Sequence, residues 1–264
     1  MEMNIDDCHK VLLDIAKDIH RVCVENGIPY FMLGGTMLGA IRHKGFIPWD
    51  DDMDLGIPRR YFKKFEEVYT RECRSIYKVN NVDNSKHIGI NFLKISDTRT
   101  LIKEQTKEDI KEEMGLNVDI FPLDRTDGRK DRFTSLNWWI IFSMKIFYYK
   151  TFSIRRAAFK RKVVAVLVRL LLPFRKRTII SFIEKHFILP IKADSHMVNF
   201  YGEYKLKEII DARYFGTPRL YPFEDTEFYG VELPDPYLKC LYGNYMWIPP
   251  EDQRHLHHVE MRWK

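Results

Sequence analysis

The sequence predicts an α/β (α+β) fold that carries a helical insertion, and two observations lead to this prediction. Over residues 1–125, short apolar segments typical of strands alternate with segments whose apolar residues recur at helical spacing. Residues 133–190 then change to an aromatic, basic and helix-like composition with almost no acidic residues. At 264 residues, of which 45% are hydrophobic and 30% charged, the chain is long enough to bury a sizeable core.

The first predicted element is a helix over residues 5–25. Its apolar side chains recur at helical spacing and would form one buried face: Val11, Leu12, Ile15, Ile19 and Val22. Gly27 and Pro29 follow at once and would end the helix.

A strand, a glycine turn, a short helix and a second strand are predicted next. Residues 30–35, YFMLGG, read as a strand that enters a glycine turn, and Thr36 is a good N-cap for a short helix over residues 37–43. Residues 53–57, MDLGI, predict the second strand. A charged amphipathic helix over residues 58–71 would follow it, because proline is favoured in the first turn of a helix.

Two further strands complete the predicted core. Residues 88–95, IGINFLKI, alternate in polarity, and residues 116–121, LNVDIF, read as a strand that Pro122 would close. Composition then divides the chain into three predicted regions: a core over 1–130, a helical, basic and aromatic region over 131–210, and a segment over 211–264 that packs back on the core.

Charge and cysteine content favour a protein of a reducing compartment with an anionic partner. The chain has 43 Lys and Arg against 37 Asp and Glu. Its four cysteines are scattered and form no CxxC pair, which argues against a disulfide framework and a zinc site. The polar N-terminal residues do not resemble a signal peptide. We therefore expect a cytoplasmic location.

An acidic cluster ends the stretch GGTMLGAIRHKGFIPWDDDMD at residues 34–54. Aspartates next to proline and glycine commonly form solvated turns, because Asp caps its own backbone. A calcium-binding loop is excluded, since the positions that require glycine and glutamate are Leu55 and Tyr61.

A metal site is the third interpretation of the cluster. If residues 53–57 form a strand, Asp52 and Asp54 project from one face, because side chains at i and i+2 share a face. Such a pair repels unless a cation lies between the carboxylates, and divalent ions can clamp a phosphoryl group during its transfer. Asp51 would point the other way and Asp50 would shape the entry loop. Asp119, a lone charge within an apolar strand, would supply a third carboxylate, unless it is salt-bridged or at an exposed edge.

The glycine turn would supply the phosphate-binding half of the same site. Gly34 and Gly35 allow close approach of the backbone, and Thr36 would begin a helix whose first N–H groups can bind phosphate oxygens. A Gly-Gly pair alone is weak evidence for a phosphate-binding turn, but its combination with the same-face aspartates is a much more specific signal.

Three blocks together resemble the LicD family, which includes bacterial phosphorylcholine transferases and has fukutin among its distant relatives. These blocks are GGT…LGAIRHKGFIPWDDDMDLG, VDIFPLD and YLKCLYGNYMWIPP. The resemblance implies a nucleotidyltransferase-like core with a mixed β-sheet and flanking helices, and a requirement for Mg²⁺, with Mn²⁺ as an alternative. It also implies transfer of a phospho-alcohol group from a CDP-alcohol donor such as CDP-choline. The acceptor would be a hydroxyl of a surface glycan, such as lipopolysaccharide or teichoic acid, or of its lipid-linked oligosaccharide precursor.

The resemblance also carries over roles for individual residues. It places Gly34, Gly35 and Thr36 in the phosphate-binding turn, Asp52 and Asp54 in the metal-binding pair, and Asp119 as the third carboxylate, which assists deprotonation of the acceptor hydroxyl.

Four further residues are candidates for donor binding, each with a structural alternative. Lys94 could neutralise a phosphate or be a surface lysine, and Arg42 and His43 could steady a diphosphate or order the loop. Trp49 could contact a choline head group through its ring or pack in the core.

The basic and aromatic middle predicts contact with an anionic membrane surface. Residues 136–149 and 163–174 are apolar, but Lys145 and Arg169 interrupt them, so neither reaches the roughly 20 apolar residues of a membrane-spanning helix. Their Trp, Tyr and basic residues suit helices that lie on the inner face of the cytoplasmic membrane. The alternative is a helical hairpin packed on the core.

Two other functions compete with phospho-alcohol transfer. The same core could transfer a nucleotide to a small molecule, with pyrophosphate rather than CMP released. A non-catalytic membrane-binding module would have no use for three convergent carboxylates. Nucleic acid is not an expected partner, because long aliphatic side chains interrupt the basic residues.

Overall fold

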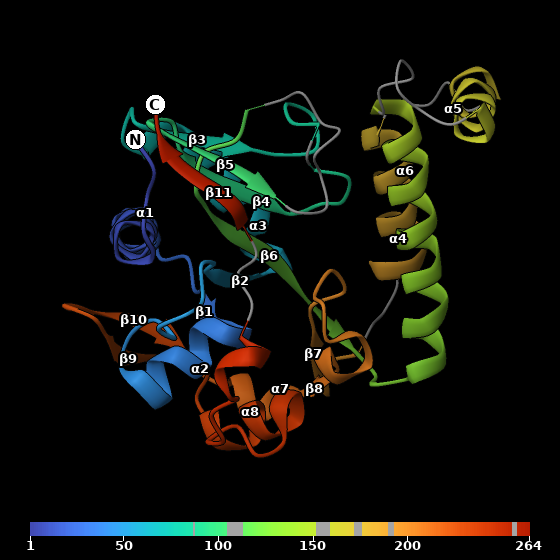
Figure 1. The fold of residues 1–264 in the computed structure, drawn as a ribbon. Coiled ribbons are helices and arrows are strands. Elements are labelled where there is room, and N and C mark those ends of the chain that lie inside the picture. The colour runs from blue at the N-terminus through green and yellow to red at the C-terminus, as the bar shows by residue number, and fades with distance from the viewer. Residues whose placement is uncertain (87, 105–112, 152–158, 172–175, 190–192, 255–257) are drawn as a thin grey trace.

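A mixed β-sheet with helices on both sides forms the centre of the protein in the computed structural model (Figure 1). The structure describes residues 1–86, 88–104, 113–151, 159–171, 176–189, 193–254 and 258–264. This arrangement confirms the predicted α/β class with flanking helices.

Strand β6 is the central strand of the sheet. The order is β1 (Phe31–Met32), β2 (Asp54–Pro58), β6 (Asn117–Thr126), β4 (Leu93–Asp97) and β3 (Tyr77–Asn80). Strands β2 and β6 run parallel and the other pairs are antiparallel. The far end of β6 pairs with β7 (His196–Val198), which pairs with β8 (Ile210–Asp211), so part of the predicted middle region belongs to the core sheet.

Helices α1 (Ile5–Glu25) and α3 (Arg59–Glu72) pack together against this sheet. Helix α1 has the predicted bounds, and its apolar face is buried. Helix α2 (Gly34–His43) packs against α8 (Pro234–Tyr242) near the short helix α7 (Ala212–Phe215). The remaining strands form two pairs, β9 (Arg219–Phe223) with β10 (Thr226–Gly230) and β5 (Thr100–Glu104) with β11 (His258–Trp263).

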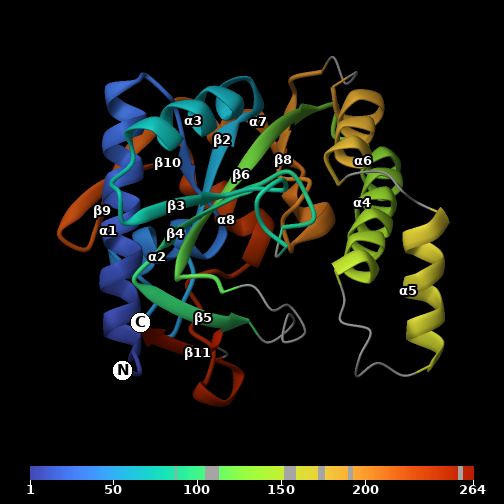
Figure 2. The same cartoon turned by 90° about the horizontal axis from the view of Figure 1, so that it is seen from above.

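A separate helical layer stands beside the sheet, on the side away from α1 (Figures 1 and 2). It contains α4 (Lys130–Thr151), α5 (Phe159–Leu171) and α6 (Lys176–Ile183), and α6 continues into a π-helical turn, η2 (Glu184–Ile188). Two short 3₁₀ turns, η3 (Lys205–Glu208) and η4 (Glu251–Gln253), follow later in the chain. Within the described ranges, no helix is both long and apolar enough to cross a membrane.

Three local predictions were wrong, each for a physical reason. Helix α2 starts at Gly34, so Thr36 lies inside it, and the Thr36 hydroxyl accepts a hydrogen bond from the Asp54 N–H instead of capping the helix (2.8 Å). Strand β4 begins at Leu93 rather than at residue 88. Pro122 does not close β6. It lies between the part of β6 that pairs with β4 and the part that pairs with β7, so its missing N–H interrupts neither antiparallel pairing.

Candidate active site

Three charged residues lie in a row across the sheet. Asp54 on β2 is the direct partner of Asp119 on β6, which is in turn the partner of Lys94 on β4. Paired residues of neighbouring strands share a face and lie about 5 Å apart. Lys94 donates to both carboxylate oxygens of Asp119 (2.9 and 3.0 Å) and to Asn117 Oδ1 (3.0 Å). The register therefore sets two carboxylates side by side with one ammonium group beyond them.

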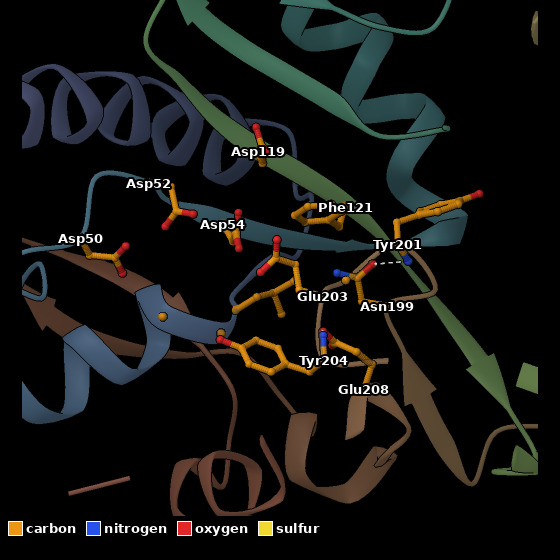
Figure 3. A pocket seen from close by; sticks show the side chains of 14 residues that line it. Asp50, Asp52, Asp54, Asp119, Phe121, Asn199, Tyr201, Glu203, Tyr204 and Glu208 are labelled. Atoms are coloured by element: carbon orange, nitrogen blue, oxygen red, sulfur yellow. Dashed lines mark hydrogen bonds between the residues drawn. The ribbon is translucent and has the colours of Figure 1, made fainter. Parts of the chain in front are cut away.

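A cavity of about 170 Å³ opens over the Asp54 end of this row (Figure 3). Four segments line it: the β1–α2 junction, the loop before β2, β6, and the loop over residues 199–208. Its described lining contains six carboxylates and no Lys, Arg or His. The lining residues are Leu33, Gly34, Gly35, Asp50, Asp52, Asp54, Asp119, Phe121, Asn199, Tyr201, Gly202, Glu203, Tyr204 and Glu208.

The carboxylates of the cavity raise one another's pKa. Burial raises the pKa of the Asp54 carboxyl well above its usual value, and repulsion from Asp52 and Asp119 adds to the shift, while Lys94 opposes it. Burial and the negative charge of Asp52 likewise raise the pKa of Asp50. In the described part of the chain, no set of three or more Asp, Glu, His or Cys side chains is arranged to hold a metal ion as it stands. A cation among these carboxylates would relieve their mutual repulsion.

The glycine turn and the acidic cluster are held to each other directly. Gly34 N–H donates to the buried hydroxyl of Tyr237 on α8 (3.0 Å), and the Thr36 hydroxyl holds the backbone of Asp54. At Gly35 a Cβ atom would lie 2.9 Å from Asp50 Oδ2, so glycine lets this carboxylate approach the helix. The first turn of α2 and the aspartates therefore form one rigid unit.

Asp50 joins the cavity, although the sequence led us to expect only a role in the entry loop. The backbone carbonyl of Asp50 accepts a hydrogen bond from His9 Nε2 on α1 (2.7 Å), which fixes the loop. Asp51 is fully buried and does not line the cavity, as strand alternation predicts. Asp52, Asp54 and Asp119 line one cavity, as the sequence predicts.

Other predicted site residues lie outside the cavity lining. Arg42 donates to the backbone carbonyls of Tyr245 and Trp247 (3.0 and 3.1 Å) and to His43 Nε2 (2.9 Å). The guanidinium of Arg254 lies 4.2 Å from the centre of the Trp49 ring. These contacts give Arg42, His43 and Trp49 structural roles, as the Asp119 ion pair does for Lys94. A direct role of these residues in donor binding stays a prediction.

The loop over residues 199–208 forms a wall of the cavity that the sequence did not predict. It follows β7 and brings Tyr201, Glu203, Tyr204 and Glu208 to the cavity. Glu208 accepts a hydrogen bond from the Tyr204 N–H (3.4 Å), which holds the loop closed. The YGEY run, with an acidic residue between two tyrosines, was the available signal.

A partly buried arginine joins this wall to the helical layer. Arg59 donates to both carboxylate oxygens of Asp124 on β6 (2.8 and 2.7 Å) and to Glu184 in η2 (2.6 Å). Glu184 also accepts hydrogen bonds from Asn91 (2.6 Å) and from the hydroxyl of Tyr201 (3.5 Å). The start of α3, β6, the helical layer and the cavity wall are thus tied at one point.

Comparison with known proteins agrees with this fold. The family model of the LicD/FKTN/FKRP nucleotidyltransferase domain matches residues 27–164, so the chain belongs to this family. The lipopolysaccharide cholinephosphotransferase LicD of Haemophilus influenzae is 27% identical over 268 residues, which cover 95% of this chain and 94% of that protein. The ribitol 5-phosphate transferase FKRP of Homo sapiens is 36% identical over 69 residues, 26% of this chain and 14% of FKRP. The chain is a LicD-type transferase.

We predict that Lys94→Met lowers the free energy of unfolding by about 3 kcal/mol, because it leaves the Asp119 carboxylate without its ammonium partner in a largely buried place. Urea denaturation followed by circular dichroism measures this change. Lys103→Met is the matched control, because Lys103 pairs with Glu260 at 3.7 Å on the exposed β5–β11 pair and should cost at most about 1 kcal/mol. Equal losses in the two variants would contradict the structural role of Lys94.

Glu208 should make the stability of the protein depend on pH. Burial raises the pKa of its carboxyl from 4.5 to about 7, so the folded protein binds this proton more tightly than the unfolded chain. Stability from this group is complete below about pH 4.5 and falls as the pH rises to about 7. Glu208→Gln should therefore match the wild type at pH 4.5 and exceed its free energy of unfolding by about 3 kcal/mol at pH 8. Urea denaturation between pH 4.5 and pH 8 tests this prediction. Glu227→Gln, at an exposed position, is the control and should show the same change of the free energy of unfolding with pH as the wild type. The same pH dependence in Glu208→Gln as in the wild type would contradict the role of Glu208.

Proposed function

We propose that the chain is a Mg²⁺-dependent phosphotransferase. It moves a phospho-alcohol group of the phosphocholine type from a CDP-activated donor to a hydroxyl of a cell-surface glycan or its lipid-linked precursor. The observation that carries the proposal is the single cavity in which Asp52, Asp54 and Asp119 meet the first turn of α2. The similarity to the lipopolysaccharide cholinephosphotransferase of H. influenzae, which aligns over nearly the whole chain, supports the same chemistry.

The carboxylates of Asp52, Asp54 and Asp119 are the groups that would hold Mg²⁺, or Mn²⁺ in its place. Hard divalent cations prefer such oxygen ligands. The raised pKa of Asp54, caused by burial and by its carboxylate neighbours, is the imbalance that a cation would correct. When bound, the metal supplies charge neutralisation to the donor phosphates. The open first turn of α2, at Gly34 and Gly35, offers the phosphates a second surface.

Asp119 is the residue that we assign to the acceptor proton. The acceptor oxygen attacks the phosphorus that carries the alcohol, and the new P–O bond forms as the bond from that phosphorus to the CMP oxygen breaks. The hydroxyl proton passes to the Asp119 carboxylate, and CMP leaves. Lys94 donates to both oxygens of Asp119, which fixes the position of this carboxylate at the edge of the cavity.

The far wall of the cavity favours a cationic alcohol over a neutral polyol. Three aromatic and two acidic residues line it: Phe121, Tyr201, Tyr204, Glu203 and Glu208. In Figure 3 the Glu203 carboxylate points toward the aspartate side of the cavity. Aromatic faces and carboxylates attract a quaternary ammonium group. We therefore favour choline, as in the cholinephosphotransferase LicD, over ribitol, as in the ribitol 5-phosphate transferase FKRP.

The proposal includes a place of action. A lipid-linked acceptor would be met by an enzyme in the cytoplasm that lies peripherally on the inner face of the cytoplasmic membrane. The alternative reaction, transfer of a nucleotide to a small molecule, would release pyrophosphate in place of CMP.

Replacing Asp54 by Asn should lower CMP release from CDP-choline by at least about 100-fold, because a bound metal contributes several kcal/mol to the transition state. Chromatography of CMP measures this with a glycan acceptor present. Asp225→Asn is the control. Asp225 lies on the β9–β10 turn, where its exposed carboxylate pairs with Lys17 of α1, so this substitution should leave the rate unchanged. Equal CMP release by Asp54→Asn and wild type would refute the site.

Chelation with EDTA should abolish CMP release, and Mg²⁺ should restore it. Binding to the folded state alone also raises stability, so Mg²⁺ should raise the melting temperature of the wild type but not of Asp54→Asn. The melting experiment needs no substrate. The same shift in both proteins would exclude Asp54 as a metal ligand.

Tyr204→Leu should raise the KM for CDP-choline about fivefold, which corresponds to loss of one cation–π contact of about 1 kcal/mol. Tyr204→Phe keeps the ring and should change this KM little. The KM for CDP-ribitol is the internal control and should respond less to the loss of the ring. Steady-state kinetics with both donors tests this, and an equal rise for both would argue against a subsite for a cation.

A further inference from the structure

Helix α4 is apolar on two faces. Its inner face is buried in a second core under the helical layer, through Phe133, Leu136 and Ile140. Its outer face nevertheless exposes Trp138, which is 59% exposed, and Phe142, which is 42% exposed and stacked on Trp138. A surface helix of a globular protein normally has a polar outer face. The outer face of α4 therefore calls for a partner.

Helix α5 extends the same surface. Ala165 is its fully buried residue in the described part of the chain, whereas Val166, Leu167 and Leu170 are 44%, 48% and 71% exposed. Figures 1 and 2 show α5 beside α4 on the outer side of the molecule, and the two helices pack together. We call the exposed residues of α4 and α5 the outer helical face. Contiguous exposed apolar surface of this kind marks an interaction site.

The charge of this region selects the kind of partner. The sequence has no Asp or Glu between Asp131 and Glu184. Lys160, Arg161 and Arg169 of α5 are exposed among its aliphatic residues. Two copies of this surface placed face to face would bring basic residues against basic residues, which disfavours a symmetric dimer. Aromatic, aliphatic and basic side chains on one helical surface are the composition that binds an anionic bilayer interface.

We propose that the outer helical face docks on an anionic lipid bilayer, with α4 and α5 lying in the interface. The apolar side chains enter the boundary between head groups and acyl chains, and the basic side chains contact lipid phosphates. Docking of the transferase on the bilayer does not depend on which donor it uses.

The docked helices would hold the candidate active site close to the bilayer. Helix α4 packs against η3, which follows Tyr204 and ends at Glu208 of the cavity wall. Through Glu184 in η2, the layer also contacts Arg59 and the hydroxyl of Tyr201. An acceptor anchored in the same bilayer would therefore reach the cavity without leaving the membrane surface.

Vesicle flotation tests the proposal. The full chain should float with vesicles of phosphatidylglycerol and phosphatidylcholine at low salt, float much less with phosphatidylcholine alone, and be released by high salt. Leu167→Ser with Leu170→Ser should abolish flotation. Lys160→Glu with Arg161→Glu should weaken binding at least about fivefold per residue, the effect of about 1 kcal/mol for each basic charge at the surface. Leu220→Ser, which changes a 46% exposed leucine on β9, and Lys63→Glu, which changes an exposed lysine on α3, are the matched controls and should float like the wild type.

Three results would overturn the proposal: a wild-type protein that stays with the lipid-free fraction, α5 variants that float as well as the wild type, or a dimer by light scattering that the α5 leucine variant dissociates. CMP release with a soluble acceptor should be unchanged in the α5 variants, which lie outside the cavity. Normal flotation without CMP release would therefore leave the docking surface in place and count against the proposed reaction alone.

Discussion

The parallel pairing of β2 with β6 is the constraint on which the candidate site depends. It sets Asp54 opposite Asp119, and the antiparallel pairing of β6 with β4 then sets Lys94 opposite Asp119. Like charges on directly opposite residues are unfavourable in a sheet. The sheet therefore carries a local cost at this point, which one lysine offsets only in part. Such a local cost is typical of a functional site rather than of a part of the sheet selected for stability.

The surroundings keep this unfavourable arrangement in place. The hydroxyl of Thr36 holds the backbone of Asp54, His9 holds the backbone of Asp50, and Tyr237 holds Gly34. Each of these groups comes from a different helix: α2 and α1 hold the acidic residues, and α8 holds the glycine turn beside them. Carboxylates that repel one another can remain close because their backbones have little freedom to move apart.

The predictable parts of the fold and site were those set by local patterns. The expected alternation correctly separated Asp52 and Asp54 from Asp51, although of these residues only Asp54 lies in β2, and helical spacing located α1. The wall at Tyr201 and Glu203 was not predictable in this way, because it depends on β7 pairing with the far end of β6 about 70 positions earlier in the chain. Thr36 has the residue type of an N-cap, yet tertiary contact with Asp54 determined its role. Trp49 could not be assigned from sequence, since the residue that covers its ring is Arg254.

The hydrogen bond from Gly34 to Tyr237 has a consequence for how the protein is made. The aspartates and the glycine turn are synthesised within the first half of the chain, but the opposite wall of the cavity lies at residues 199–208, and Tyr237 holds Gly34. A nascent chain can therefore form the β2–β6 pair long before it can close the site. The family match ends at residue 164, so a fragment with those bounds would contain the aspartates but lack the wall that faces them. The cavity is therefore built from both halves of the chain and extends beyond the segment that the family match covers.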